Sequence, residues 1–228
     1  MDKISKKIKM IDKIKKIINK KKIDGYLVSK NDDYFTEYSN ISNLKLISNF
    51  SGSAGFALIL KKKNYLFVDG RYTLQAKKQS GKKFDIFEIP YKWPKDLFKK
   101  IKKPIIGFDP NLFTYNTLKI YFEDTCSLMP ITNKIFKKSN NLKSVKENPF
   151  FLIEDKVAGE SAKSKINKVF NALKKKKINN LFVSAGENAC WLLNIRGKDL
   201  PNSPVANCRL ILSSNKHIYF FTSKNKIK

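Results

Sequence analysis

The stretch FSGSAGFALILKKKNYLFVDGRYTLQA, residues 50–76, decides the fold, because it joins a small-residue turn, two apolar runs and a charged turn. Residues 56–60 and 65–68 have the length and composition of strands, and the polar residues between them predict a β-hairpin. Residues 70–79 have a helical pattern, and Asp69 is placed as its N-cap. The segment therefore predicts a hairpin whose second strand leads directly into a helix.

The segment GSAG, residues 52–55, has two interpretations. One is a phosphate-binding loop, but such loops follow a strand and open a helix, whereas this segment precedes the strand at 56–60. The other is a tight turn in which two backbone segments approach closely, which glycine permits because it has no Cβ atom. The order of the elements favours the tight turn.

Helical and strand patterns alternate on both sides of this segment. Isoleucines recur at helical spacing in residues 3–21, a strand pattern follows at 25–28, and residues 29–49 predict a polar loop with one helical turn at 34–38. The same criteria predict strand 84–89, helix 94–101, strand 105–108, helix 114–123 and strand 127–131. This alternation predicts an α/β domain, and the hairpin makes its sheet mixed.

A second unit follows a polar segment. Residues 136–158 contain Pro149 and predict a linker between a first domain, 1–135, and a second, 159–228. The second domain is predicted to contain helix 161–176, strand 181–183, helix 187–193 and a hairpin of strands 209–213 and 217–222. This order repeats that of residues 3–68, which predicts a truncated second copy of the same topology.

The chain is strongly basic. Its 228 residues carry 47 lysines and arginines against 19 aspartates and glutamates, a net charge of +28. Such a charge is typical of proteins that bind nucleic acid or acidic membranes. The lysines, however, occur in short runs spread along the chain, and only three of the 47 basic residues are arginines, which bind phosphate in bidentate geometry. The pattern favours a solvated surface, with neither nucleic acid nor membrane as partner.

The first helix and the cysteines indicate in which cellular compartment the protein is expected to reside. The basic amphipathic helix at 3–21 could lie on a membrane, but the strand pattern directly after it favours packing of its isoleucine face on a sheet. No apolar run is long enough for a membrane span, and the lysine-rich start lacks the pattern of a secretory signal. Cys126, Cys190 and Cys208 form no CxxC pair, which predicts reduced thiols in a cytoplasmic protein.

Residues with catalytic chemistry are sparse. His217, the one histidine, lies in a predicted strand, and no pattern of metal ligands or activated nucleophiles accompanies it. Asp69 and Arg71 stand where a strand ends and a helix begins, a common place for functional groups, although capping and ion pairing account for both. The turn at 194–199 contains a further candidate ion pair, of little value if exposed. The residues alone predict no self-sufficient catalytic site.

Several segments in a fixed order carry a resemblance to a known family. They are DGYLVS (24–29), EY (37–38), FSGSAG (50–55), VDGRY (68–72) with QA (75–76), IGFDP (106–110), AGES (158–161) with Lys165, and CWLLNIRG (190–197) with DLP (199–201) and PV (204–205). Together they resemble the amino-terminal half of the three-domain Xaa-Pro aminopeptidases of the creatinase/prolidase group. Asn49 and Cys190 depart from the pattern, since they stand where the family usually has glycine and alanine.

The resemblance implies creatinase-type N-terminal domains of an enzyme that removes an N-terminal residue preceding proline. It implies a carboxy-terminal domain in which two Asp, two Glu and one His hold two divalent metals, usually manganese, with none of these ligands in residues 1–228. It further implies that Arg71 contacts the proline-containing peptide and that the complete enzyme is a homodimer. This chain alone is expected to bind no cofactor and to be inactive.

Two hypotheses remain open. The first is the non-catalytic N-terminal part of an Xaa-Pro aminopeptidase, which shapes substrate access and subunit contacts. The alternative is a stand-alone binding or scaffold module that keeps the creatinase fold without peptidase activity. A reading frame that continues past Lys228 into metal-ligand motifs would exclude the module.

Overall fold

The β-hairpin predicted around residues 56–68 forms because two apolar strands meet across a short lysine-rich turn. Strand β2 (Gly55–Leu60) pairs antiparallel with β3 (Asn64–Asp69). Gly55 has a φ of 155°, and a Cβ atom there would lie 2.8 Å from the carbonyl oxygen of Phe67. The close backbone approach expected of residues 52–55 is therefore present.

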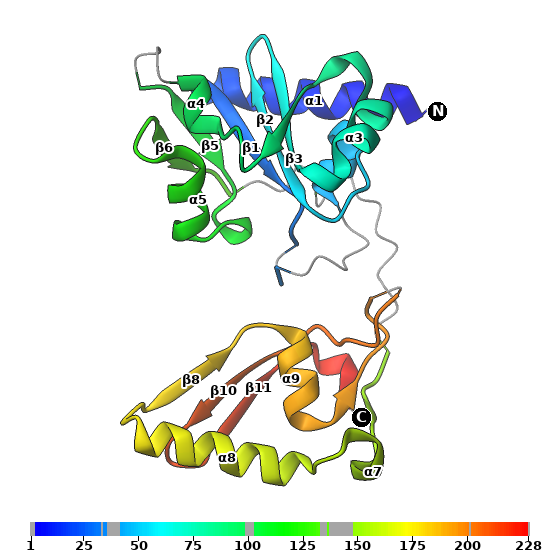
Figure 1. The fold of residues 1–228 in the computed structure, drawn as a ribbon, viewed down its shortest axis with the longest axis vertical. Helices are drawn as coiled ribbons and strands as arrows, with labels where there is room; N and C mark the ends of the chain where they lie inside the picture. Colours follow the sequence, from blue (N-terminus) through cyan, green and yellow to red (C-terminus); the bar gives the residue numbers. More distant parts are fainter. Residues whose placement is uncertain are drawn as a thin grey trace. The chain divides into compact units, whose positions relative to one another are not determined.

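The computed structural model describes residues 3–32, 34–35, 42–98, 103–132, 136, 148–200 and 202–227, with side chains from residue 10 onward. The chain divides into two units (Figure 1). Unit 1 comprises Met1–Asp33 and Ile41–Asn141, and unit 2 comprises Tyr34–Asn40 and Leu142–Lys228. Most of the helical turn predicted at 34–38 lies outside the described residues.

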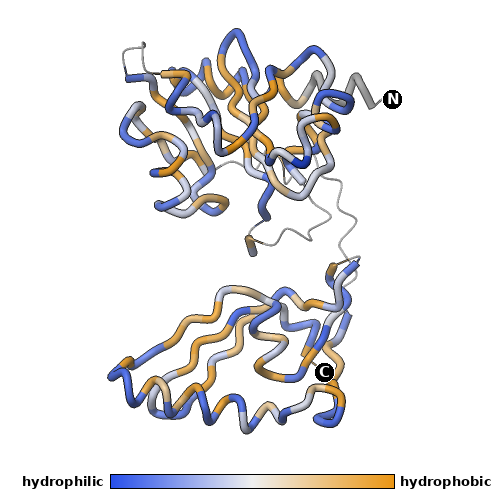
Figure 2. The backbone as a smooth tube through the Cα atoms, in the orientation of Figure 1, coloured by the Kyte–Doolittle hydropathy of each residue, from blue (hydrophilic) through white to orange (hydrophobic). Residues whose placement is uncertain are grey.

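Unit 1 contains a six-stranded mixed sheet in the order β4-β3-β2-β1-β5-β6. Besides the hairpin, its strands are β1 (Gly25–Ser29), β4 (Asp85–Ile89), β5 (Ile105–Phe108) and β6 (Ser127–Pro130). β1 pairs antiparallel with β2, whereas β3–β4, β1–β5 and β5–β6 are parallel pairs. The mixed sheet predicted from the hairpin is confirmed, and Figure 2 shows hydrophobic residues along its strands.

Helices cover both faces of this sheet (Figure 1). One face carries α1 (Lys3–Lys20), α2 (Asn43–Ser48) and α3 (Thr73–Ser80), and the other carries α4 (Pro94–Phe98) and α5 (Tyr115–Phe122). Short 3-10 turns occupy Gly70–Tyr72, Gly81–Lys83 and Pro110–Leu112. Ile14 and Ile18 of α1 are fully buried in the core, so the isoleucine face of this basic helix packs on the sheet, as the sequence favours.

Helix α2 is a correction, because residues 29–49 are predicted as a loop whose one helical turn lies elsewhere. The Ser42 side chain accepts a hydrogen bond from the Lys45 N–H and so caps the helix. Leu44 and Ile47 are fully buried. A six-residue helix with two core apolar side chains is too short to show a helical period in the sequence.

Unit 2 repeats the first three strands of unit 1 in a smaller sheet. Its strands β8 (Asn180–Val183), β10 (Arg209–Ser213) and β11 (Ile218–Phe221) lie in the antiparallel order β11-β10-β8, like β3-β2-β1 in unit 1. Helices α8 (Ala162–Lys175) and α9 (Gly186–Leu193) pack on one face of this sheet (Figure 1). The predicted second copy of the topology is confirmed for these elements.

The other face of the unit 2 sheet carries exposed aromatic side chains. Phe182, Tyr219 and Phe221 are 57%, 51% and 51% exposed. The strand register places Phe182 and Tyr219 on either side of Ile211, so these side chains share one face. The corresponding face in unit 1 packs against α4 and α5.

Short elements stand where the sequence predicts a linker. Strand β7 (Phe151–Leu152) pairs with β9 (Ile195–Arg196), and helix α7 (Asp155–Ala158) follows β7. Residues 137–147 of the predicted linker lie outside the described residues. Near the C-terminus, Lys224–Lys226 form a 3-10 turn.

Candidate functional site

The pair Asp69 and Arg71 lies where β3 ends and the chain turns into α3. The Asp69 carboxylate accepts hydrogen bonds from Arg71 Nε at 2.8 Å, from Arg71 Nη2 at 3.4 Å and from the Arg71 backbone N–H at 3.0 Å. One carboxylate thus caps the turn Gly70–Tyr72 and binds the guanidinium beside it. Both roles weighed from the sequence, cap and ion-pair partner, are present.

Arg71 remains accessible within this pair. Its side chain is 73% exposed, and that of Asp69 is 36% exposed. The guanidinium carbon lies 5.5 Å from the centroid of the Tyr72 ring. Because a guanidinium is a planar group with paired donors, it binds carbonyl and carboxylate oxygens in a defined orientation. The arrangement presents an oriented, solvent-facing cation at the end of β3.

The turn before β2 is joined by hydrogen bonds to Tyr72 and to helix α3. The Tyr72 hydroxyl and Ser53 Oγ lie 2.9 Å apart. The side-chain amides of Gln75 and Gln79 donate to Ser51 Oγ at 3.0 and 2.9 Å, and Gln79 Oε1 accepts from the Ser51 N–H at 2.9 Å. These hydrogen bonds hold the turn against Tyr72 and α3, which follow Arg71 in the chain.

The Asp69 carboxyl is held in its ionised form. Hydrogen bonds from the Arg71 side chain, the largest cause, and from the Arg71 backbone N–H lower the pKa of Asp69 below the usual range. A ligand carboxylate at Arg71 therefore competes with an ionised partner for one guanidinium. The geometry of this pair suits hydrogen bonding to an acceptor oxygen and not proton transfer.

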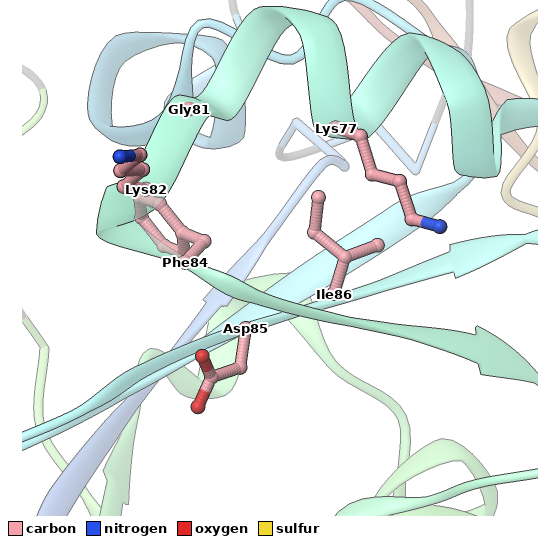
Figure 3. Close-up of a pocket in the computed structure, with 6 residues that line it drawn as sticks. All are labelled: Lys77, Gly81, Lys82, Phe84, Asp85 and Ile86. Carbon is pink, nitrogen blue, oxygen red and sulfur yellow. The ribbon is translucent and has the colours of Figure 1, made fainter.

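A surface cavity of about 540 Å³ lies beside the edge strand β4 (Figure 3). It is lined by Lys77, Gly81, Lys82, Phe84, Asp85 and Ile86. Its charged groups do not converge, because in Figure 3 the Asp85 carboxylate points to the side opposite Ile86 and Lys77. Asp85 instead has Lys63 Nζ at 3.9 Å. The cavity therefore does not assemble a catalytic group.

The described part of the chain contains no candidate metal site. Across the residues that the structure describes, no group of three or more His, Cys, Asp or Glu is placed to hold a metal ion. His217 is exposed and lies one residue before β11, in the hairpin turn and not within the strand as predicted. As to membranes, none of the described helices combines the length and the apolar character of a span.

In unit 2, the turn at 194–199 is built on a buried lysine that the sequence did not mark as functional. Lys165 of α8 is 3% exposed. Its Nζ donates to Asn194 Oδ1 at 2.5 Å and to the Trp191 carbonyl oxygen, and lies 4.4 Å from the centroid of the Trp191 ring. The lysine thus joins α8 to the end of α9.

Asn194 extends this network to the start of unit 2. Its Nδ2 donates to Asp155 Oδ1 at 3.0 Å and to the Glu160 carbonyl oxygen at 2.9 Å. A sequence signal for the network exists, since Lys165 lies four residues before Val169 and so on the apolar stripe of α8.

Asp199, in the same turn, forms an ion pair with a residue that is distant in the sequence and not with a neighbour. Asp199 binds Lys226, and its carboxylate accepts a hydrogen bond from the Asn207 N–H at 2.6 Å. The side chains of Asp199 and Lys226 are only 4% and 5% exposed. This buried pair ties the C-terminal 3-10 turn to residue 199, and no local pattern indicates it because the partners lie 27 residues apart.

Comparisons with known proteins give both units the same family description. Residues 10–137 and residues 141–228 each match a family model described as the creatinase/prolidase N-terminal domain. The first of these matches already covers more than half of the chain.

Curated relatives align over nearly the whole chain. A probable Xaa-Pro aminopeptidase P of Coprinopsis cinerea is 28% identical over 95% of this chain, and one of Laccaria bicolor is 30% identical over 92%. Xaa-Pro aminopeptidase 1 of Dictyostelium discoideum is 27% identical over 96%. The alignments cover 37%, 35% and 38% of these relatives, so the chain spans little more than a third of their length.

One solved structure matches the fold of the whole chain. The crystal structure of an X-prolyl aminopeptidase from Caenorhabditis elegans, described as a cytosolic enzyme with a di-nuclear active site, matches with a TM-score of 0.85. The match covers 100% of this chain and 40% of that one, at 22% identity. At this identity the likeness shows a shared fold.

Proposed function

The chain belongs to the creatinase/prolidase N-terminal domain family, and on that premise we propose that it is the non-catalytic amino-terminal part of an Xaa-Pro aminopeptidase. The observation that carries the proposal is the alignment of both units with Xaa-Pro aminopeptidases over 92–96% of the chain. The complete enzyme removes an N-terminal residue that precedes proline, and this part shapes substrate access and subunit contacts.

The described residues do not fit a metal-binding role in this reaction, because they assemble no cluster of three ligating side chains. On the family resemblance, we assign two divalent metals, usually manganese, to the carboxy-terminal part of the complete enzyme. No catalytic step is assigned to the residues of this chain.

Arg71 is proposed to contact the proline-containing peptide. Support comes from its 73% exposure, from its place at the end of β3 and from its orientation by Asp69. Its N–H groups are suited to donate paired hydrogen bonds to a peptide carbonyl or carboxylate. Arg71 therefore acts in binding and orienting the peptide.

The proposal includes a cytoplasmic homodimer as the state of the complete enzyme. The C. elegans protein with the same fold is described as cytosolic, which supports the compartment. Sedimentation of the complete enzyme tests the assembly, and fractionation of cells tests the compartment.

The first test of function measures hydrolysis of an Xaa-Pro peptide by the purified chain 1–228 in the presence of manganese. We expect no turnover, and we expect the complete enzyme to cleave the same peptide. Metal-dependent turnover by the chain alone would overturn its assignment as a non-catalytic part. Lack of Xaa-Pro cleavage by the complete enzyme would overturn the substrate class.

The second test replaces Arg71 in the complete enzyme. We expect Arg71→Ala to raise KM for an Xaa-Pro peptide about tenfold or more, because a charged hydrogen bond of about 1.5–3 kcal/mol is lost. Arg71→Lys should recover only part of this loss, since an ammonium lacks the planar fork. Lys62→Ala, another exposed cation of unit 1, is the matched control. An unchanged KM for Arg71→Ala would remove the role of Arg71 and leave the family assignment intact.

A further inference from the structure

Two cysteine thiols meet in the core of unit 2. Cys190 lies in α9, Cys208 lies just before β10, and their side chains are 1% and 0% exposed. The Ala206 N–H donates to Cys190 Sγ at 3.3 Å, and the Cys208 thiol lies 3.5 Å from the Ala206 carbonyl oxygen, to which it donates. Both sulfurs are therefore gathered around one backbone residue.

We propose that Cys190 and Cys208 form a redox-active dithiol, which a hydroperoxide converts into an intramolecular disulfide. The third cysteine, Cys126, lies in unit 1 among apolar side chains and has no share in this pair. The proposal adds a modification site to unit 2, distinct from the peptide contact proposed for Arg71.

The surroundings make the two sulfurs unequal. Interaction with the Cys208 thiol, the largest cause, the Ala206 N–H and the charge of Arg196 lower the pKa of Cys190. Interaction with the Cys190 thiol, the largest cause, and burial raise the pKa of Cys208. Because the thiolate is the reactive form of cysteine, Cys190 is the attacking sulfur and Cys208 is the resolving thiol.

The oxidation balances in two steps. The Cys190 thiolate attacks one oxygen of hydrogen peroxide, the O–O bond breaks, and the departing hydroxide takes a proton to become water, which leaves a sulfenic acid on Cys190. The Cys208 sulfur then attacks Cys190 Sγ, the S–O bond breaks, and hydroxide leaves with the Cys208 proton as a second water. Two thiols and one peroxide thus give one disulfide and two waters.

The new bond would link α9 to β10 across the turn that contains β9 and Asp199. Since a covalent link in this loop restricts the unfolded chain, oxidised unit 2 should unfold at higher denaturant concentration than reduced unit 2. A dithiol reductant should reverse the shift.

The test treats the folded chain 1–228 with hydrogen peroxide, blocks remaining thiols by alkylation and digests with trypsin. Lys177, Arg196, Lys198 and Arg209 place Cys190 in peptide 178–196 and Cys208 in peptide 199–209. We expect these two peptides to be joined by a disulfide, while Cys126 is recovered alkylated. Burial raises the pKa of Cys126 to about 12, which makes it an internal reference for an unreactive thiol.

Cysteine-to-alanine variants and a control in denaturant complete the peroxide experiment. Cys190→Ala and Cys208→Ala should each abolish the joined peptides and the peroxide-induced rise in stability, whereas Cys126→Ala should retain both. In denaturant the selectivity should vanish, because it depends on the folded contacts. Absence of the joined peptides from the folded wild-type chain, or oxidation of Cys126 at the same rate as Cys190, would overturn the proposal.

Discussion

A single buried cation, Lys165, links more parts of unit 2 than any local motif suggests. Its ammonium is bound by Asn194 Oδ1 and the Trp191 carbonyl oxygen and faces the Trp191 ring. Burying a charge is tolerated only where hydrogen bonds replace water, and these contacts do so. The lysine therefore belongs to the structure of unit 2, unlike the solvated lysines that dominate the composition.

We expect Lys165→Met to destabilise the chain by about 3 kcal/mol, because buried acceptors lose their donor while the aliphatic stem is kept. Lys163→Met, on an exposed position of the same helix, should change stability by less than about 0.5 kcal/mol. Urea unfolding followed by circular dichroism measures both. Equal effects of the two variants would show that the network contributes no more than a surface lysine does.

A second prediction at the residue scale concerns Asp24, which ties the start of β1 to β5. Its Oδ2 accepts a hydrogen bond from the Ile105 N–H at 2.9 Å, and its Oδ1 lies 3.3 Å from Lys61 Nζ. The backbone hydrogen bond, the largest cause, lowers the pKa of Asp24. A lowered carboxyl pKa means that the ionised group stabilises the fold above about pH 4, where the unfolded carboxyl titrates. This stabilisation is lost as the pH falls through the folded pKa.

Asp24→Asn should therefore cost about 0.5–1 kcal/mol at neutral pH, since the side chain is 47% exposed and solvent screens the pair. The difference from wild type should shrink towards zero in acid. Unfolding midpoints measured from neutral to acid pH check this, with the exposed Asp12→Asn as control. A difference that stays constant across that pH range would contradict an ionic contribution.

At the scale of elements, side-chain hydrogen bonds at helix ends define helix boundaries that hydrophobic periodicity does not predict. Helix α2 has only two fully buried apolar side chains, and its start is defined by the cap of Ser42 on the Lys45 N–H at 3.1 Å. By contrast, Ser80 at the end of α3 is 1% exposed, and its hydroxyl has no hydrogen-bond partner among the described residues. Two serines at helix ends thus make opposite contributions.

Ser42→Ala should destabilise the chain by about 1 kcal/mol, because an N-cap hydrogen bond is lost. Ser80→Ala should be neutral or stabilising by up to about 1 kcal/mol, because it removes an unpaired buried hydroxyl. Denaturant midpoints of the two variants measure the contrast. A larger loss for Ser80→Ala than for Ser42→Ala would contradict these assignments.

At the scale of the whole molecule, the attraction between exposed aromatic side chains of unit 2 opposes the repulsion that comes from the high positive charge. Phe182, Tyr219 and Phe221 expose half or more of their surface on one face of the unit 2 sheet. Exposed apolar patches favour association, whereas a net charge of +28 opposes it. Added salt screens the repulsion and leaves the apolar attraction in place.

We therefore expect the chain 1–228 to self-associate increasingly as salt is raised, as measured by sedimentation velocity. Replacing Phe182 and Tyr219 together by serine should lower the association, while replacing the exposed Leu74 of unit 1 by serine is the control. A monomer at every salt concentration would show that this face does not drive self-association.

Much of the fold was accessible from the sequence because its signals are local. The isoleucine period of α1, the hairpin of β2 and β3 and the Asp69 cap each depend on residues close together in the chain. The paired Asp69 and Arg71 of the candidate site were accessible for the same reason. Short elements with little periodicity, α2 and β7, were not, because only their caps and cross-strand partners define them.

The sequence by itself determined the order of the longer helices and strands, the repeat of one topology and the position of Arg71 after β3, because hydrophobic patterns and turn residues act over a few positions. Only the tertiary structure decided which distant groups meet: Lys165 with Asn194, Asp199 with Lys226, and both Cys190 and Cys208 with the backbone of Ala206. The physical reason is that burial and hydrogen bonding select these partners through the packing of α8, α9 and β10, which no local pattern encodes.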